Sequence, residues 1–297
     1  MRLPRLLSVY LLIGLALIPG LTTAEDAFAE QTLRIGFYAR AFPDFSIEDL
    51  QITVKLLAEE IGKNSGVQTT VTVFDNIAMM SRAFEQGKIN FALTSTLNLL
   101  NDFDNSLFSD GFRVTRSIEF PDSIAVLTRK NEGMDNFGAL RGKRLALAEY
   151  DTIADLYMDY LALTTFNKGY KASFKEIPRD KKAQQVILKL FFGQADVICV
   201  YLNTYNVATE LNPQLLAKIQ VISQLNGISQ GAGLFHKNVQ PAFRERVIAE
   251  VLKLDTHIRG QQLLQIFKAE KTLRATVADL AGAKKLFADY SQLKKTK

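Results

Sequence analysis

Short apolar runs alternate with longer amphipathic stretches along the first part of the chain. Short runs of this kind are typical of strands, whereas apolar residues spaced three or four positions apart are typical of helices. The predicted order is a strand at 32–38, a helix at 47–61 that ends near Gly62, a strand at 69–74, a helix at 77–86, a strand at 89–93 and a helix after residue 96. Strand and helix alternating in this way predict a mostly parallel sheet with helices on both faces.

The alternation breaks after residue 114, where the pattern favours long extended segments without a helix between them. It then starts again, which indicates a second, smaller unit of the same architecture. The elements predicted beyond the break are extended segments at 114–119 and 123–128, a turn and strand at 140–148, a helix at 153–166, a strand at 173–177, a helix at 181–192, a strand at 196–200, extended segments at 219–223 and 231–235, and helices at 241–254, 261–267 and 276–290.

Two α/β units joined by two crossings define the predicted fold class, a two-lobed α/β protein with a two-segment hinge. We assign residues 30–118 and 224–297 to lobe one and residues 119–223 to lobe two. In such a protein the carboxyl ends of the strands line a cleft between the lobes. Open α/β sheets bind their ligands at these strand ends, so we expect a ligand there.

The N-terminus has the layout of a secretory signal. Two arginines precede an apolar run at 6–21, which is shorter than the roughly 20 residues that a membrane-spanning helix needs. We predict a signal peptide at 1–24 that directs the chain to export, with cleavage after Ala24 or, as second choice, after Ala29. An uncleaved membrane anchor is the alternative interpretation.

Composition narrows the classes of partner. The 297-residue chain has a formal net charge of +5, which falls to +3 without the two arginines of the signal peptide, and its basic residues cluster only at the C-terminus. Mild basicity fits a small anionic ligand and gives little support to a nucleic-acid partner. The single cysteine, Cys199, lies in an apolar run, so no intrachain disulfide is possible.

Four motifs, taken in order, carry a resemblance to a known family. They are LRIGFY at 33–38, EQGKINFA at 85–92, LRGKRLA at 140–146 and GQADV at 193–197. In their order and spacing the chain resembles the phosphate/phosphite/phosphonate-binding proteins of ABC transporters, which have the type 2 periplasmic binding fold. The resemblance implies a periplasmic protein that closes two lobes around a small ligand and delivers it to an ABC permease.

The chain departs from that family where ligand contacts are expected. Phosphonate-binding members are similar to one another in a Ser-Thr-Ser-Gly-like run at the first helix of the second lobe, where this chain has DTIA at 151–154. They tend to have a histidine where this chain has Arg179 and an aspartate where it has Tyr201. A Gly-Pro pair followed by tyrosine is replaced by TST at 94–96. The resemblance therefore supports the fold and the role more strongly than phosphonate as the ligand.

In lobe one the candidate ligand-binding residues follow the first and third strands. Tyr38 offers an aromatic ring and a phenol donor, and Arg40 offers a charge-assisted contact to an oxyanion. The hydroxyl groups of Thr94, Ser95 and Thr96 donate to an anion or, alternatively, cap the next helix. For Tyr38 the alternative is a space-filling rim aromatic, and for Arg40 it is a solvated side chain.

In lobe two the candidates follow the corresponding strands. Asp151 and Thr152 lie at a helix start, where capping is the favoured role, and Asp151 repels an anion unless an amine or a cation is bound. Arg179 keeps a positive charge at the position of the family's histidine. Tyr201 and Asn203 form a polar cluster that orients the ligand, with helix capping as the alternative for Asn203.

No catalytic or metal-binding pattern accompanies these residues. His236 and His257 lie far from any zinc spacing, pairs such as Asp155 and Asp159 are commonplace on solvated helices, and nucleophile-elbow, phosphate-loop and dinucleotide motifs are missing. We predict no enzyme activity, no cofactor, no metal and a monomer that meets an ABC permease. The alternatives are a sensory subunit for a membrane signalling protein and, less favoured, an enzyme on the same fold.

Overall fold

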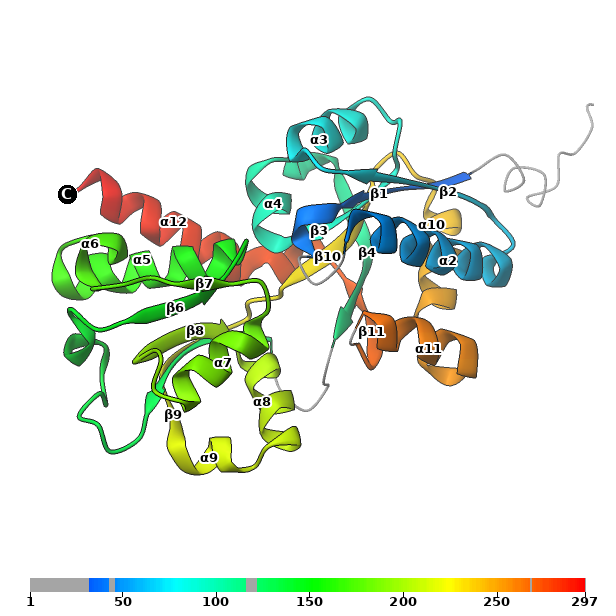
Figure 1. Ribbon diagram of the computed structural model, residues 1–297. Coiled ribbons are helices and arrows are strands. Elements are labelled where there is room, and N and C mark those ends of the chain that lie inside the picture. The colour runs from blue at the N-terminus through cyan, green and yellow to red at the C-terminus, as the bar shows by residue number, and fades with distance from the viewer. Residues whose placement is uncertain (1–31, 43–45, 116–121, 268, 297) are drawn as a thin grey trace, which may run out of the picture.

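The computed structural model describes residues 32–42, 46–115, 122–267 and 269–296, which form two α/β units side by side (Figure 1). Each unit has one sheet covered by helices, so the predicted α/β class with two lobes is confirmed. Within the described part of the chain, no helix combines the length and the apolarity that crossing a membrane requires.

The first unit is built on a six-stranded sheet in the order β11-β4-β10-β3-β1-β2. Its strands are β1 (Thr32–Tyr38), β2 (Gln68–Phe74), β3 (Phe91–Ser95), β4 (Phe108–Thr115), β10 (Gly231–His236) and β11 (Lys271–Ala275). Its helices are α2 (Ile47–Ser65), α3 (Ile77–Glu85), α4 (Thr96–Asn101), α10 (Pro241–Val251) and α11 (Ile258–Ile266). Short 3₁₀ turns complete it: η1 (Ala39–Ala41), η2 (Asn105–Leu107), η4 (Leu254–Thr256) and η5 (Val277–Leu280).

The second unit is built on a five-stranded sheet in the order β7-β6-β8-β5-β9. Its strands are β5 (Ser123–Arg129), β6 (Leu145–Ala148), β7 (Arg179–Asp180), β8 (Val197–Tyr201) and β9 (Ile219–Asn226). Its helices and its 3₁₀ turn are η3 (Phe137–Leu140), α5 (Thr152–Phe166), α6 (Tyr170–Ser173), α7 (Ala183–Phe191), α8 (Leu202–Leu211) and α9 (Gln214–Lys218).

Both sheets are mixed, whereas the sequence pattern predicted mostly parallel ones. The parallel pairs are those connected through a helix, such as β1 with β2 and β6 with β8. The antiparallel pairs involve the strands next to the crossings: β4 and β10 in the first unit, β5 and β9 in the second. A strand that arrives from the other unit has no crossover helix to set it parallel, so it pairs in the opposite direction.

Each unit has its own hydrophobic core. In the first unit Phe91 stacks on Phe112 with ring centroids 4.6 Å apart, and Phe84 packs on Phe108 at 5.3 Å. In the second unit β5 is buried on both faces, because Val126 packs into the cluster that contains α5 while its neighbours on the strand pack into the cluster that contains α7. The two cores make each unit a rigid body that can carry one half of a site.

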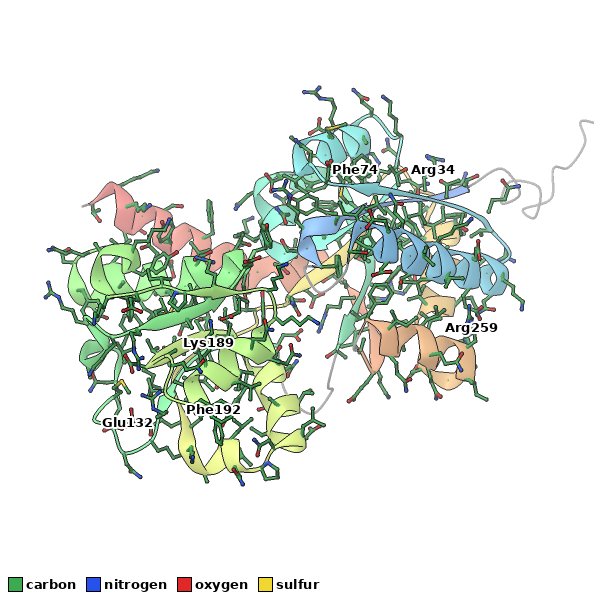
Figure 2. All side chains as sticks on the ribbon, in the orientation of Figure 1. Arg34, Phe74, Glu132, Lys189, Phe192 and Arg259 are labelled. Atoms are coloured by element: carbon green, nitrogen blue, oxygen red, sulfur yellow. The ribbon has the colours of Figure 1, made fainter. Side chains whose placement is uncertain are left out.

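The same polar tie joins two parallel strands in each unit. In the first unit the Oδ1 atom of Asn90 accepts a hydrogen bond of 2.8 Å from the backbone N–H of Arg34, which Figure 2 labels. In the second unit Oδ2 of Asp196 accepts bonds from the backbone N–H and Nε of Arg144 at 2.9 and 3.0 Å. The Arg144 guanidinium beside it holds the pKa of Asp196 well below its usual range. All four residues lie at the amino ends of their strands, so the motifs that carry the family resemblance hold the fold together.

Some element boundaries differ from the prediction. The helix α2 runs three residues past Gly62 to Ser65, because the glycine in the left-handed conformation that ends it is Gly66, with a φ of 66°. Gly62 instead lets the helix approach β2 closely, since an added Cβ would lie 2.8 Å from Cγ2 of Thr69. The strand predicted at 173–177 begins too early, because Ser173 closes the helical turn α6 by donating to the Gly169 carbonyl at 3.0 Å. Glu176 forms a parallel bridge with Arg144, and the strand itself is β7 at Arg179–Asp180. The edge strand β11 was not predicted.

The C-terminal helix α12 (Ala281–Lys295) packs beside α5 of the second unit (Figure 1). Ala283 and Leu286 are buried in the core of that unit, and Tyr290 packs against it. The proposed lobe boundaries assigned residues 224–297 as a whole to lobe one. These boundaries stay a prediction. Within residues 224–297, α12 is the part that packs on the second unit.

Candidate ligand-binding site

The carboxyl ends of the parallel strands of the two units are directed towards each other (Figure 1). The strands β1 and β3 end at Tyr38 and Ser95 in the first unit, and β6 and β8 end at Ala148 and Tyr201 in the second. All ten predicted site residues follow these ends or lie beside them in β7. The structure therefore places the two predicted groups at the mutually facing edges of the two sheets.

Tyr38 and Arg40 lie together after β1. The ring of Tyr38 is half-buried against the core of the first unit, and this burial raises the pKa of its phenol although the charge of Arg40 acts in the opposite direction. Arg40 is exposed on η1. A neutral phenol donor thus lies beside a solvent-accessible guanidinium, a pair suited to an oxyanion.

The hydroxyl groups of residues 94–96 have partners within the protein. Ser95 caps α4 by accepting a bond from the Asn98 backbone N–H at 3.3 Å, and Thr94 donates to Oδ1 of Asn98 at 3.3 Å. Thr96 is fully buried and donates to the backbone carbonyl of Ser229 at 2.6 Å. The capping alternative therefore applies to Ser95, and Thr96 ties α4 to the β9–β10 crossing.

Asp151 caps α5 by accepting a hydrogen bond of 3.0 Å from the Ala154 backbone N–H. Burial, with a smaller contribution from the nearby Asp155 carboxylate, raises the pKa of Asp151 to about 6, although the bond to Ala154 and the charge of Arg179 act against the rise. The following Thr152 is exposed. A carboxylate thus occupies the helix end that would otherwise attract an anion.

Arg179 is held beside this helix start by neighbours that the sequence did not reveal. Its guanidinium forms an ion pair with Asp155, donates to the Tyr170 hydroxyl at 3.1 Å and donates to the Ala148 carbonyl at 3.2 Å. The Tyr170 hydroxyl in turn donates to Asp155 at 2.6 Å. Asp155 was interpreted as one of two acids on a solvated helix, and the structure shows a partly buried carboxylate that neutralises Arg179.

Tyr201 and Asn203 lie where β8 runs into α8. Burial, followed by the charge of Asp151, raises the pKa of Tyr201 well above its usual range. Asn203 is 8% exposed, and its Oδ1 has no hydrogen-bond partner among the described residues. No side-chain cap closes α8, and the positive end of its helix dipole lies at this strand end.

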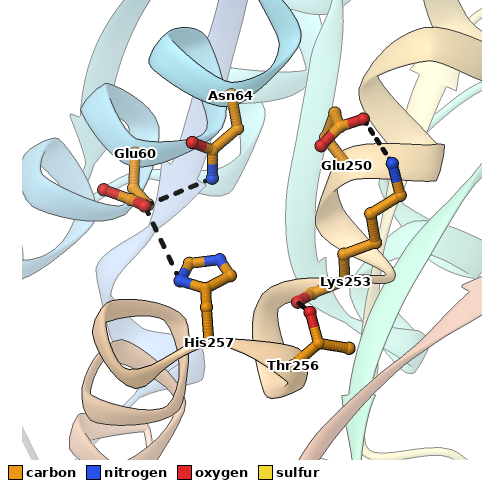
Figure 3. Close-up of a pocket in the computed structure, with 6 residues that line it drawn as sticks. All are labelled: Glu60, Asn64, Glu250, Lys253, Thr256 and His257. Carbon is orange, nitrogen blue, oxygen red and sulfur yellow. Dashed lines mark hydrogen bonds and ion pairs between the residues drawn. The ribbon is translucent and has the colours of Figure 1, made fainter.

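A polar surface pocket of about 280 Å³ lies elsewhere in the first unit, between α2, α10 and α11 (Figure 3). There Nδ1 of His257 accepts a bond of 3.1 Å from the Gly260 N–H and lies 4.0 Å from Oε1 of Glu60. This pocket contains none of the predicted site residues. We keep the candidate site at the strand ends, because open α/β sheets bind their ligands there. Within the described ranges, no cluster of three or more His, Cys, Asp or Glu side chains is arranged to hold a metal ion.

Two α/β units, joined by crossing strands and facing each other with their strand ends, define a two-lobed binding protein of the type 2 periplasmic class. The family model for "ABC transporter, phosphonate, periplasmic substrate-binding protein" matches residues 40–280. The chain belongs to this family. The predicted family and the role of a solute-binding protein that serves an ABC transporter are confirmed, and the family is a periplasmic one.

Solved structures share the fold at low sequence identity. The binding protein component of an ABC phosphonate transporter (PA3383) from Pseudomonas aeruginosa is 12% identical, with a TM-score of 0.60 over 89% of this chain and 87% of that one. PhnD1 from Prochlorococcus marinus, in complex with methylphosphonate, is 14% identical, with a TM-score of 0.61 over 88% and 98%. The aliphatic sulphonate binding protein SsuA from Escherichia coli is 13% identical, with a TM-score of 0.53 over 89% and 93%. No curated protein matches the chain.

Proposed function

We propose that the chain binds a small organic phosphonate that also carries an amine, held between the strand ends of the two units. The structural relative PhnD1 is in complex with methylphosphonate, which supports an oxyanion head group. The observation that adds the amine is the carboxylate of Asp151 at the start of α5. An ammonium group beside Asp151 supplies the counter-charge that Arg179, paired with Asp155, does not.

The oxyanion then lies at the start of α8 and beside the first unit. The positive dipole end at the start of α8 favours an anion. Arg40 with the neutral phenol of Tyr38 faces the oxyanion from the other unit. The nearly buried Oδ1 of Asn203, which has no partner among the described residues, can accept a hydrogen bond from the ammonium group of the ligand. These residues are the ligand contacts that we propose, with Thr152, Thr94 and Ser95 at the rim and Thr96 as a support.

A thermal-shift panel with the variant Asp151→Asn tests this function. Asparagine keeps the helix cap and removes the charge. With 2-aminoethylphosphonate at about 100 times its Kd, we expect the Tm of the wild-type protein to rise by about 5 °C. With methylphosphonate, phosphate or methanesulfonate we expect smaller shifts. In Asp151→Asn the affinity for 2-aminoethylphosphonate should fall about tenfold, and the affinity for methylphosphonate should stay or rise.

The outcomes separate the head group from the amine. Equal shifts with methylphosphonate and 2-aminoethylphosphonate, unchanged in Asp151→Asn, would leave a phosphonate-binding protein whose Asp151 only caps α5. Shifts with simple amines and none with any phosphonate or sulfonate would overturn the oxyanion. Arg40→Ala, at an exposed position, serves as the control for the contact to the anion, because it should weaken the binding of all phosphonates alike.

We further propose that the protein acts as a non-enzymatic monomer that delivers its ligand to an ABC permease after export. The signal peptide predicted at 1–24 and both cleavage sites lie outside the described residues. The family supports delivery to a permease and gives no support to the alternative of a sensory subunit. Permease and ATPase genes beside this one favour transport, whereas a gene for a membrane signalling protein favours sensing.

A further inference from the structure

The described chain crosses between the two cores at a place that the two-segment hinge does not include. Leu280 is buried in the core of the first unit, and Ala283 is buried in the core of the second. Ala281 and Gly282 alone separate them. Besides the β4–β5 and β9–β10 connections, η5 and α12 therefore make a third connection between the units.

This third connection lies directly on the second one. A Cβ atom added at Gly282 would overlap the carbonyl oxygen of Gly227 and would lie 2.9 Å from its carbonyl carbon. Gly227 follows β9 and has a φ of 73°, which favours glycine. Its N–H donates to the backbone carbonyl of Asp122 at 2.9 Å, at the start of β5. Segments from all three connections thus meet at one point.

Beyond Gly282, α12 is attached to the second unit. Leu286 is 3% exposed in its core, and the Tyr290 hydroxyl donates to Oδ2 of Asp159 on α5 at 2.8 Å. On the side of the first unit, Leu97 and Leu100 of α4 pack against the same core (Figure 1). At this third connection, any rotation between the units must therefore be absorbed within the two residues before Ala283 and along the contact between α4 and α12.

We propose that Ala281–Gly282 is a third pivot of the hinge, and that α12 is a strap that moves with the second unit when the units rotate. The pivot rests on the proposed function in one respect: closure of the two units around a ligand is the movement that the rotation would serve. The close approach of Gly282 to Gly227 keeps the three connections at one axis, so the strap limits the directions in which the units can turn.

Distances between spin labels test the pivot in protein without ligand. Cysteines replace the exposed Lys55 of the first unit and Lys171 of the second, while the buried Cys199 stays unlabelled. Alanine is a better helix former than glycine, so Gly282→Ala should raise the Tm if Gly282 is an ordinary helix residue. An added methyl group at position 282 would overlap the Gly227 carbonyl, so the close approach itself predicts a Tm lower by several °C. If Gly282 is also the pivot, the distance distribution between the two labels should shift or broaden.

Ala288→Gly is the matched control, because position 288 lies exposed on the same helix. It should lower the Tm through helix propensity and leave the distance distribution unchanged. A Gly282→Ala protein with the wild-type distribution would overturn the pivot, whether its Tm is raised or lowered. None of these measurements needs a ligand, so a failed ligand panel leaves the result valid.

A second set of labels tests the strap, also where Gly282→Ala does not fold. A label at the exposed Lys284 of α12 should stay at a narrow distance from Lys171 and vary more relative to Lys55. Tyr290→Phe, which removes the hydroxyl that bonds to Asp159 on α5 and to Lys294 within α12, should broaden the distribution between Lys284 and Lys171. Equally broad distributions to both units in the wild-type protein would show that α12 belongs to neither and would end the proposal.

Discussion

At the scale of single residues, Asp151 has two opposing effects on the folded state. It satisfies the backbone N–H of Ala154 at the start of α5, which is the role that aspartate plays at most helix starts. Its charge is nevertheless half-buried near Asp155 and is not neutralised by Arg179, whose guanidinium is paired with Asp155. The pKa of about 6 reflects the unfavourable burial of this charge. Protonation removes the charge, and the protonated carboxyl can still accept the capping bond.

The variant Asp151→Asn should therefore stabilise the protein in a pH-dependent way. The folded-state pKa of about 6 lies above the unfolded value of 3.8, so the folded state binds the proton more tightly and loses stability as the pH rises from about 4 to about 6. At pH 8 the variant should exceed the wild type by about 1 kcal/mol, after allowance for solvent screening and the lost dipole interaction. At pH 4 the two should be equal in urea unfolding. A less stable variant at pH 8 would show that the charged cap is favourable.

At the scale of elements, local sequence patterns predicted the helices and strands well, whereas contacts between residues far apart in the chain could not be predicted. The apolar face of α2, with Leu50, Val54 and Ile61, is visible in the sequence because its residues repeat every three or four positions. The partner of Thr96 is Ser229, 133 positions away, and no local pattern connects them. For the same reason the site could be predicted only as a set of strand ends. Which side chain faces the ligand, and which faces a neighbour as Arg179 does, depends on packing.

The tie between β6 and β8 is an element-scale feature whose contribution can be measured. Asp196→Asn should lower the Tm at pH 7 by about 2–6 °C, because it weakens charge-assisted bonds to Arg144 worth about 1–2 kcal/mol at a partly exposed site. The folded pKa of Asp196 lies below the unfolded value, so its contribution is present above about pH 4 and is lost as the pH falls further. The difference from wild type should shrink at pH 3.

Ligand affinity should not change in Asp196→Asn, since the tie lies at the opposite edge of the sheet from the strand ends. A changed affinity would contradict that placement.

At the scale of the whole molecule, polar groups at the connections help to hold the two cores in one arrangement. Arg113 at the end of β4 and Asp122 before β5 form an ion pair of 2.5 Å across the first connection, with 15% and 19% of the side chains exposed. The Asp122 carbonyl binds Gly227 of the second connection, and Thr96 binds Ser229 beside it. Because these groups join the units, each of them influences both the stability of the molecule and the angle between its halves.

The ion pair at the first connection should respond unequally to the loss of either partner. Burial raises the pKa of Asp122 despite the charge of Arg113, so Arg113→Gln leaves a buried carboxylate without its counter-charge. This variant should lower the Tm at pH 7 by about 5 °C. In contrast, Asp122→Asn removes the carboxylate whose charge is unfavourably buried, and it should lower the Tm by at most about 2 °C. The double variant should resemble Asp122→Asn, because the removal of both charges leaves no unpaired carboxylate, and the cycle gives the coupling energy directly. Equal losses from both single variants would mean that solvent reaches Asp122 and that the first connection is held by its backbone alone.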